Sequence, residues 1–177
     1  MNEKQWEEYL NKYTGDIGTE AESKEHLDYG IQLLQEWKID HNSKICLDIG
    51  CNTSYLNGKI KAKWYGCDIQ PKEENIKITD AHNLSYHGSQ FDIVFSSHLL
   101  EHTIAPILCL EEMKRVLKDD GDIILGLPLY PEFIYDGHNY VLPEGSWKHL
   151  FTRIGLRCVN NKMLGRTMFF HLKEMIK

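Results

Sequence analysis

Short apolar runs that alternate with helix-like segments constrain this chain more strongly than any other feature of its sequence. The runs have the length and the β-branched or aromatic content of buried strands, and they lie at 44–49, 63–68, 75–79, 91–96, 122–127, 157–161 and 167–172. Helices are expected between them, at 19–38, 54–61, 106–117 and 143–154. This alternation predicts the α/β class, with a Rossmann-like, doubly wound and mostly parallel seven-stranded sheet.

Composition fits an ordinary globular protein and argues against several other classes. The 177 residues suffice for one domain with a full core. The net charge of −6 argues against a nucleic-acid partner, because such proteins usually carry a basic face. No apolar run reaches the roughly 18 residues of a membrane span, and the N-terminus lacks the apolar core of a signal peptide. Five cysteines without a CxxC pair suggest free thiols and a cytoplasmic location.

Chemistry-bearing side chains gather where the expected strands end. In a doubly wound sheet, ligands bind beyond the carboxyl ends of the strands, near the point where the strand order reverses. The candidate site therefore comprises Asp48 to Ser54, Asp68, Asp80, Ser96 to His102, and the residues from Leu127 onward.

The stretch ICLDIGCNTSYL, residues 45–56, ends the first strand in a glycine turn. Gly50 would let the backbone approach a ligand closely. The dinucleotide fingerprint GxGxxG fails here at two of its three glycines. Asn52 is the non-glycine type that best tolerates a left-handed backbone, and Thr53 or Ser54 would cap the helix expected next. On this segment alone, a plain strand-to-helix turn remains the alternative.

The turn LDIGCNTSYL also resembles the LDxGCGxG turn of class I methyltransferases, which use S-adenosylmethionine as cofactor. The resemblance implies that Asp48, Gly50 and Asn52 pass the methionine end of the cofactor. It implies that Asp68, followed by Ile69, takes the ribose hydroxyls, for which a carboxylate is a good acceptor. A similar aspartate would serve the ribose of a nicotinamide cofactor, so Asp68 alone does not separate the two.

Further segments continue the resemblance in the family's order. Asp80-Ala81 matches the pair that reads the adenine, the Asp accepting from the amine and the next backbone N–H donating to the ring. FDIVFSSHLLEH, which contains Ser96, resembles the fourth-strand segment lining the methyl-transfer site, and LKDDGDIILGLP resembles its sequel. The resemblance covers roughly 44–128 and, more weakly, GHNYVLPEGSWKHLFTRIGL at 137–156. This ordered set is far more specific than any one motif.

The segment between Asp68 and Asp80 departs from the family, whose members usually carry a helix there. It is too short for a helix with its turns, so QPKEEN is expected to be a loop. This shortened segment predicts a minimal version of the fold, with that side of the adenine pocket open.

The segment His98-Leu-Leu-Glu101-His102 has the HxxEH spacing of inverted zinc peptidases. Two histidines at i and i+4 on one helical face can bind zinc, with the glutamate as base. Such peptidases need the motif inside a long helix, whereas here it directly follows a strand and precedes the break at 103–106. A zinc hydrolase is therefore disfavoured, and no metal site is expected.

Methyl transfer to a hydroxyl would require a group that takes its proton. The catalytic candidates are His98, His102 and His138, with His98 ranked first because it lies nearest the end of the fourth strand. Glu101 and the tyrosines of an aromatic-rich loop are expected to contact the substrate; these are Tyr130, Tyr135 and Tyr140. Each histidine could equally be a surface or packing residue.

The sequence thus predicts S-adenosylmethionine-dependent methyl transfer to a small-molecule, sugar or lipid-linked acceptor. The expected single domain, 1–177, comprises an N-terminal helical lid (1–40), a cofactor-binding core (41–128), and a substrate loop with the C-terminal helix and strands (129–177). An inactive binding protein on this fold is the main alternative, and a nucleotide-linked oxidoreductase is disfavoured. Methylation of protein or nucleic acid stays open because loops set the acceptor. The expected state is a monomer or homodimer.

Overall fold

The computed structural model describes residues 20–129 and 138–175, and its described part is organised around one sheet of seven strands. The strand order is β3-β2-β1-β4-β5-β7-β6, and all neighbours are parallel except those of β7. The strands are β1 (Ile45–Ile49), β2 (Lys63–Asp68), β3 (Lys77–Ile78), β4 (Phe91–Ser97), β5 (Leu117–Pro128), β6 (Leu156–Leu164) and β7 (Thr167–Glu174). The predicted α/β fold with a mostly parallel sheet is confirmed.

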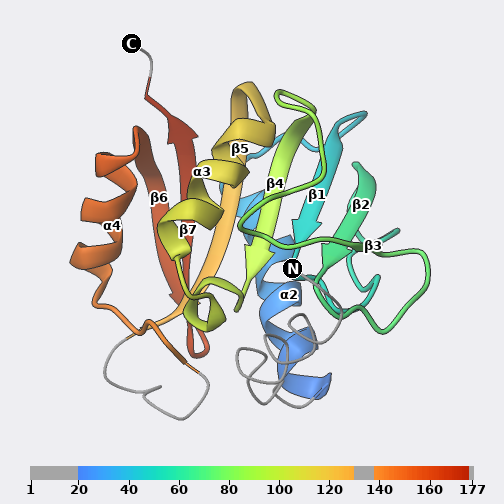
Figure 1. The fold of residues 1–177 in the computed structure, drawn as a ribbon, viewed down its shortest axis with the longest axis horizontal. Coiled ribbons are helices and arrows are strands. Elements are labelled where there is room, and N and C mark those ends of the chain that lie inside the picture. Colours follow the sequence, from blue (N-terminus) through green and yellow to red (C-terminus); the bar gives the residue numbers. More distant parts are fainter. Residues whose placement is uncertain (1–19, 130–137, 176–177) are drawn as a thin grey trace.

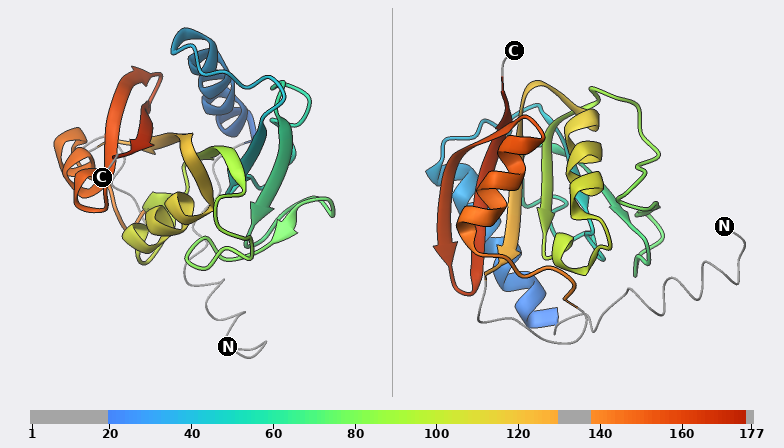
Figure 2. Two further views of the ribbon diagram at one scale, coloured as in Figure 1. Left: turned by 90° about the horizontal axis from the view of Figure 1, so that it is seen from above. Right: turned by 60° about the vertical axis from the view of Figure 1, so that its left-hand side comes forward.

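Helices cover both faces of this sheet, as Figures 1 and 2 show. Helix α2 (Glu20–Glu36) lies on one face, while α3 (Pro106–Val116) and α4 (Glu144–Arg153) lie on the other. A short 3₁₀ helix, η1 (Leu100–His102), follows β4. None of these described helices is long and apolar enough to cross a membrane.

Each face of the sheet has its own hydrophobic core, because successive side chains of a strand point to opposite faces. On β4, Val94 joins the core beneath α3 and α4, and Phe95 joins the core beneath α2. In α3, buried residues recur at helical spacing, as Cys109, Leu110 and Met113 illustrate. Strands buried on both faces explain the continuous apolar runs in the sequence.

Three details of the expected secondary structure are wrong. Residues 54–61 form successive turns instead of a helix, because Gly58 has φ of 79° and breaks the helical path. The third strand is only Lys77–Ile78. The turn expected at Asp119-Asp120-Gly121 lies within β5, where a register shift against β4 accommodates it and Asp120 takes φ of 60°.

Some expectations fall on residues outside the described ranges. These are the part of the N-terminal helical lid that precedes residue 20, and the substrate contacts of Tyr130 and Tyr135. All five cysteines lie within the described part and are free thiols, as predicted.

Candidate functional site

The carboxyl ends of β1, β2 and β4 meet at one edge of the sheet, where their arrowheads point in Figure 1. Asp48 pairs with Gly66 of β2, and Ile49 pairs with Ser96 of β4. The turn after β1 is therefore flanked by the residues that end its two neighbours. This is the place at which a doubly wound sheet binds its ligands.

The glycine turn packs directly against the segment that follows β4. Gly50 has φ of 73°, and a Cβ placed on it would lie 2.9 Å from Cδ1 of Leu99. Asn52 has φ of 52°, the left-handed conformation predicted from its residue type. Its side-chain oxygen is buried and has no hydrogen-bond partner among the described residues. Buried polar atoms are normally paired, so this oxygen can accept a bond from a ligand.

The carboxylate of Asp68 fixes the shape of the turn. Its Oδ2 accepts a hydrogen bond from the backbone N–H of Asn52 (2.9 Å), and its Oδ1 accepts one from Gln70 (2.8 Å). Each carboxylate oxygen can accept a further bond, so these contacts leave capacity for a ligand hydroxyl. Ile69, between the two bonded segments, is half-buried.

The short segment after β2 is a loop, as predicted, and it docks on the glycine turn. The backbone N–H of Lys72 donates to the carbonyl oxygen of Asn52 (2.9 Å), and the carboxylate of Glu73 accepts from the N–H of Ser54 (3.1 Å). The hydroxyl of Ser54 donates to the same carboxylate. Ser54 therefore ties two loops together, although the sequence suggested a helix cap.

Asp48 is buried beneath the turn instead of lining its surface. It is 2% exposed, and its Oδ2 accepts a hydrogen bond from the indole N–H of Trp64 (3.3 Å). Burial raises the pKa of Asp48 to about 7, and the nearby charge of Asp68 acts in the same direction. The expected direct contact of Asp48 with a cofactor would require this side chain to be uncovered.

Ser96 also lies inside the sheet. It is 0% exposed, and its hydroxyl donates to the carbonyl oxygen of Ile49 (3.0 Å). This placement argues against the contact with a cofactor that the sequence suggested. The side chain instead joins β4 to the end of β1.

Asp80 follows β3 and forms a local pair with His82. Its Oδ1 accepts from the backbone N–H of His82 (2.9 Å) and lies 2.7 Å from its Nδ1. The N–H of Ala105 donates to His82 Nε2, so the ring proton is on Nδ1. Burial raises the pKa of Asp80, but the bonds from His82 outweigh it and the net shift is downward. His82 thus holds the carboxylate of Asp80 in place. Ala81, the next residue, is half-buried.

His98 is fixed through both ring nitrogens. Its Nε2 lies 2.7 Å from the hydroxyl oxygen of Thr167 on β7, and its Nδ1 lies 3.0 Å from Oε1 of Glu101. Its backbone has φ of 53° and its N–H donates to Gly126 of β5. Because both nitrogens lie close to other polar atoms, this arrangement argues against the sequence-based prediction that His98 is the first candidate for the proton acceptor.

Sequence reasoning missed two partners of this histidine, Thr167 and His26. The rings of His26 and His98 lie 4.4 Å apart, and His26 Nδ1 lies 3.0 Å from the hydroxyl oxygen of Ser97. Burial lowers the pKa of His26 to about 3, and the neighbouring His98 acts in the same direction, so His26 stays neutral at pH 7. No local signal could identify it, because α2 reaches β4 only in the folded chain.

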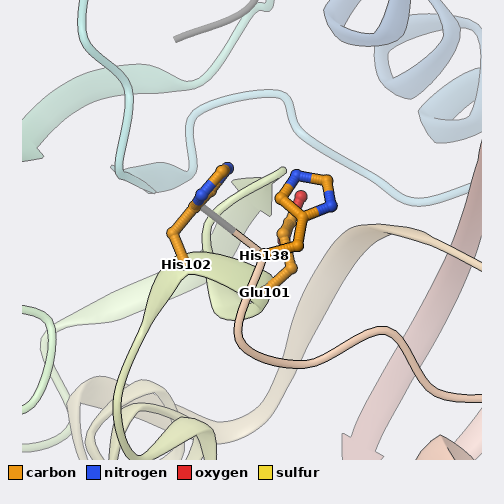
Figure 3. A group of neighbouring side chains, drawn as sticks. All are labelled: Glu101, His102 and His138. Atoms are coloured by element: carbon orange, nitrogen blue, oxygen red, sulfur yellow. The ribbon is translucent and has the colours of Figure 1, made fainter. Parts of the chain in front are cut away.

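Glu101, His102 and His138 form a compact group, which Figure 3 shows in detail. Their ligand atoms lie within 4.8 Å of one another, and the two imidazoles meet edge to face at 4.7 Å. Glu101 is 0% exposed, while both histidines are half-buried. Burial raises the pKa of Glu101, but His98 and then His102 outweigh it, so the pKa lies below its usual value.

Tyr140 lies beside this group and is anchored to the same segment. Its hydroxyl donates to the carbonyl oxygen of Ile104 (3.1 Å), and its backbone N–H donates to that of Glu101 (3.2 Å). The HxxEH segment, in turn, provides only the three-residue η1, with His98 outside it. The motif therefore lacks the long helix that the peptidase interpretation requires.

Comparisons with known proteins agree with this architecture. Residues 47–125 match the family described as Methyltransferase domain. No match is found among curated proteins. The 1,6-didemethyltoxoflavin-N1-methyltransferase of Burkholderia thailandensis, solved with 1,6-didemethyltoxoflavin and S-adenosylhomocysteine, is 13% identical with a TM-score of 0.73, over 97% of this chain and 88% of that one.

Two other solved structures illustrate how widely the fold is used. A SAM-dependent methyltransferase from Aquifex aeolicus is 15% identical with a TM-score of 0.67, over 99% of this chain and 100% of that one. The [4+2]-cyclase SpnF is 17% identical with a TM-score of 0.65, over 76% of this chain and 58% of that one. Identities this low show the fold alone, and function must be argued from the site.

Proposed function

We propose that this chain, whose residues 47–125 match the family described as Methyltransferase domain, is a class I methyltransferase that transfers a methyl group from S-adenosylmethionine to a small-molecule, sugar or lipid-linked acceptor. The matched segment 47–125 supports this enzyme class, and the similar solved structures support the fold. The observation that carries the proposal is the contact between the glycine turn at Gly50 and Leu99 of the HxxEH segment. It brings the cofactor-binding candidates and the acceptor-binding candidates side by side.

The residues of the turn fit this cofactor. The buried, unpaired side-chain oxygen of Asn52 is an acceptor for a ligand N–H, such as the ammonium group of the methionine part. Asp68 is held by two backbone N–H groups and keeps lone pairs for ribose hydroxyls. Asp80, held by His82, is the candidate for the adenine amine. When bound, S-adenosylmethionine supplies a methyl group on a positively charged sulfur.

The acceptor would lie over the segment after β4. Its nucleophilic atom gains the methyl group, and the electron pair of the broken carbon–sulfur bond remains on sulfur. An acceptor hydroxyl must also lose its proton. His102 and His138 are half-buried imidazoles at this edge and replace His98 as the first candidates for that role. Tyr140, bonded to Ile104, provides an anchored aromatic wall.

Isothermal titration tests the cofactor part directly. S-adenosylmethionine and S-adenosylhomocysteine are expected to bind at one site per chain, and a nicotinamide dinucleotide is expected not to bind. Binding of the dinucleotide alone would favour the oxidoreductase and overturn the proposal. Release of S-adenosylhomocysteine in the presence of a panel of hydroxylated acceptors separates an enzyme from an inactive binding protein, which would bind the cofactor without turnover.

A further inference from the structure

We propose that Glu101, His102 and His138 bind a divalent transition-metal cation of the Zn²⁺ class, next to the methyl-transfer site. Their ligand atoms already lie within 4.8 Å of one another. Zinc holds nitrogen and oxygen ligands at roughly 2.0–2.2 Å, so the group needs only a modest contraction to enclose an ion. The sequence argued against a metal because the HxxEH motif does not lie in a long helix. In the structure, the third ligand is His138, which lies on a different segment of the chain.

The environment of Glu101 provides a second, independent observation. The side chain is 0% exposed, and neither carboxylate oxygen accepts a regular hydrogen bond from the described residues. The Nδ1 of His98 lies 3.0 Å from Oε1 as an ion-pair contact, whereas Oε2 has no hydrogen-bond partner among the described residues. A buried carboxylate is costly unless it is paired or coordinates a metal. A bound cation would provide that missing partner.

The backbone holds His138 in place beside the two ligands from η1. The N–H of Asn139 donates to the carbonyl oxygen of Glu101 (2.6 Å), and its side-chain amide donates to that of His102 (2.9 Å). The residue after the third ligand is thus bonded to both of the other ligand residues. This arrangement joins two segments that are distant in sequence and places the three side chains next to one another, as Figure 3 shows.

The donor set indicates which cation to expect. Two imidazoles and one carboxylate suit Zn²⁺, Co²⁺ or Fe²⁺, whereas Mg²⁺ and Ca²⁺ prefer oxygen ligands. Three protein ligands leave coordination positions open, which is typical of metal sites that bind a substrate. Resting on the proposed function, we infer that these positions take an oxygen of the acceptor, because η1 follows Leu99 at the glycine turn. A hydroxyl bound to the cation would lose its proton more readily, so His102 and His138 would then act as ligands and not as proton acceptors.

Cobalt titration of the chelator-treated full chain tests the site. One Co²⁺ per chain is expected, with the visible absorption of an ion in a site of low coordination number. Glu101→Gln and His102→Ala should each weaken binding by more than about 100-fold, since outer-shell partners alone are worth about 10–100-fold. His149→Ala, on the exposed face of α4, is the matched control and should bind Co²⁺ like the parent chain.

Several outcomes would overturn the inference. If the parent chain gives no cobalt absorption, or if the two ligand variants titrate like His149→Ala, the three residues are only a polar cluster. Should Glu101→Gln fail to fold, His138→Ala replaces it, because that side chain is half-buried. Acetohydroxamate, an oxygen-donor probe, should bind the cobalt ion and change its visible spectrum. An unchanged spectrum would contradict the inference that the ion has open coordination positions.

Titration of S-adenosylmethionine into the metal-free chain keeps the two proposals separable. Cofactor binding without cobalt binding would overturn the metal site and leave the methyltransferase proposal standing. Cobalt binding without cofactor binding would overturn the methyltransferase proposal and leave the metal site standing.

Discussion

Replacement of Gly50 by alanine tests whether the glycine turn is built by its contact with Leu99. Gly50 has φ of 73°, and an added Cβ would lie 2.9 Å from Leu99 Cδ1. A left-handed backbone costs an L-residue roughly 1–2 kcal/mol, and forcing a methyl group into packed surroundings costs about 1–3 kcal/mol. Reduced freedom of the unfolded chain returns about 0.4–1 kcal/mol. We therefore expect Gly50→Ala to lower the free energy of unfolding by about 3 kcal/mol.

Gly58→Ala is the matched control. Gly58 has φ of 79°, but nothing lies within 4 Å of an added Cβ. Only the backbone strain remains, so the expected loss is about 1 kcal/mol or less. The difference of about 2 kcal/mol between the two variants isolates the Leu99 contact, and it corresponds to a shift in the urea midpoint of about 1 M.

Urea unfolding and cofactor titration measure the two consequences of this change. The double variant Gly50→Ala/Leu99→Ala should lose less free energy of unfolding than the two single variants together, because the side chain that crowds the added methyl group has been removed. Gly50→Ala should also weaken S-adenosylmethionine binding, whereas Gly58→Ala should not. Equal destabilisation of the two glycine variants would refute the packing argument.

Three further substitutions test single carboxylates. Asp68→Ala should weaken S-adenosylmethionine binding by about 1–3 kcal/mol in a calorimetric titration, and unchanged affinity would remove Asp68 from the site. The pKa of Asp48 is raised from 3.8 to about 7, so the folded state holds its proton more tightly and loses stability as pH rises between these values. Asp48→Asn should flatten that slope when urea unfolding is measured from pH 4.5 to about 8; an unchanged slope would contradict the assignment. Asp122 Oδ1 lies 2.6 Å from Nε2 of His171; burial raises the pKa of Asp122, but bonds from His171 and Lys173 lower it more. Its stabilisation is present above about pH 4 and is lost as pH falls through the lower folded value, so Asp122→Asn should cost about 1–3 kcal/mol at pH 7 and less at pH 3.

Periodicity and turn chemistry were sufficient to predict most of the fold. The second strand, Lys63–Asp68, has the predicted bounds, and the helix at Pro106 ends one residue before its predicted end. These elements are strongly patterned because each buries apolar side chains in a core. Residues 54–61 lack that guidance, since a left-handed glycine and the docking of Ser54 on Glu73 decide their path.

The candidate site was predictable only in its local parts. The left-handed Asn52 follows from its residue type, and Asp68 and Asp80 follow from their places at strand ends. The burial of Ser96 and the bond of Asp48 to Trp64 could not be predicted, because the packing of neighbouring strands decides them. The same holds for His98, whose partner Thr167 lies on a strand 69 positions away.

The sequence by itself determined the succession of strands and helices along the chain, the glycine turn and the acidic residues that end the strands. These are local properties, set by backbone preference and by the spacing of apolar side chains. Only the tertiary structure decided which polar groups are paired, and it brought His138 to Glu101 and His102. Those contacts form only when segments that are distant in sequence meet at one edge of the sheet. There the side chains are buried, and a buried charge without a partner destabilises the fold.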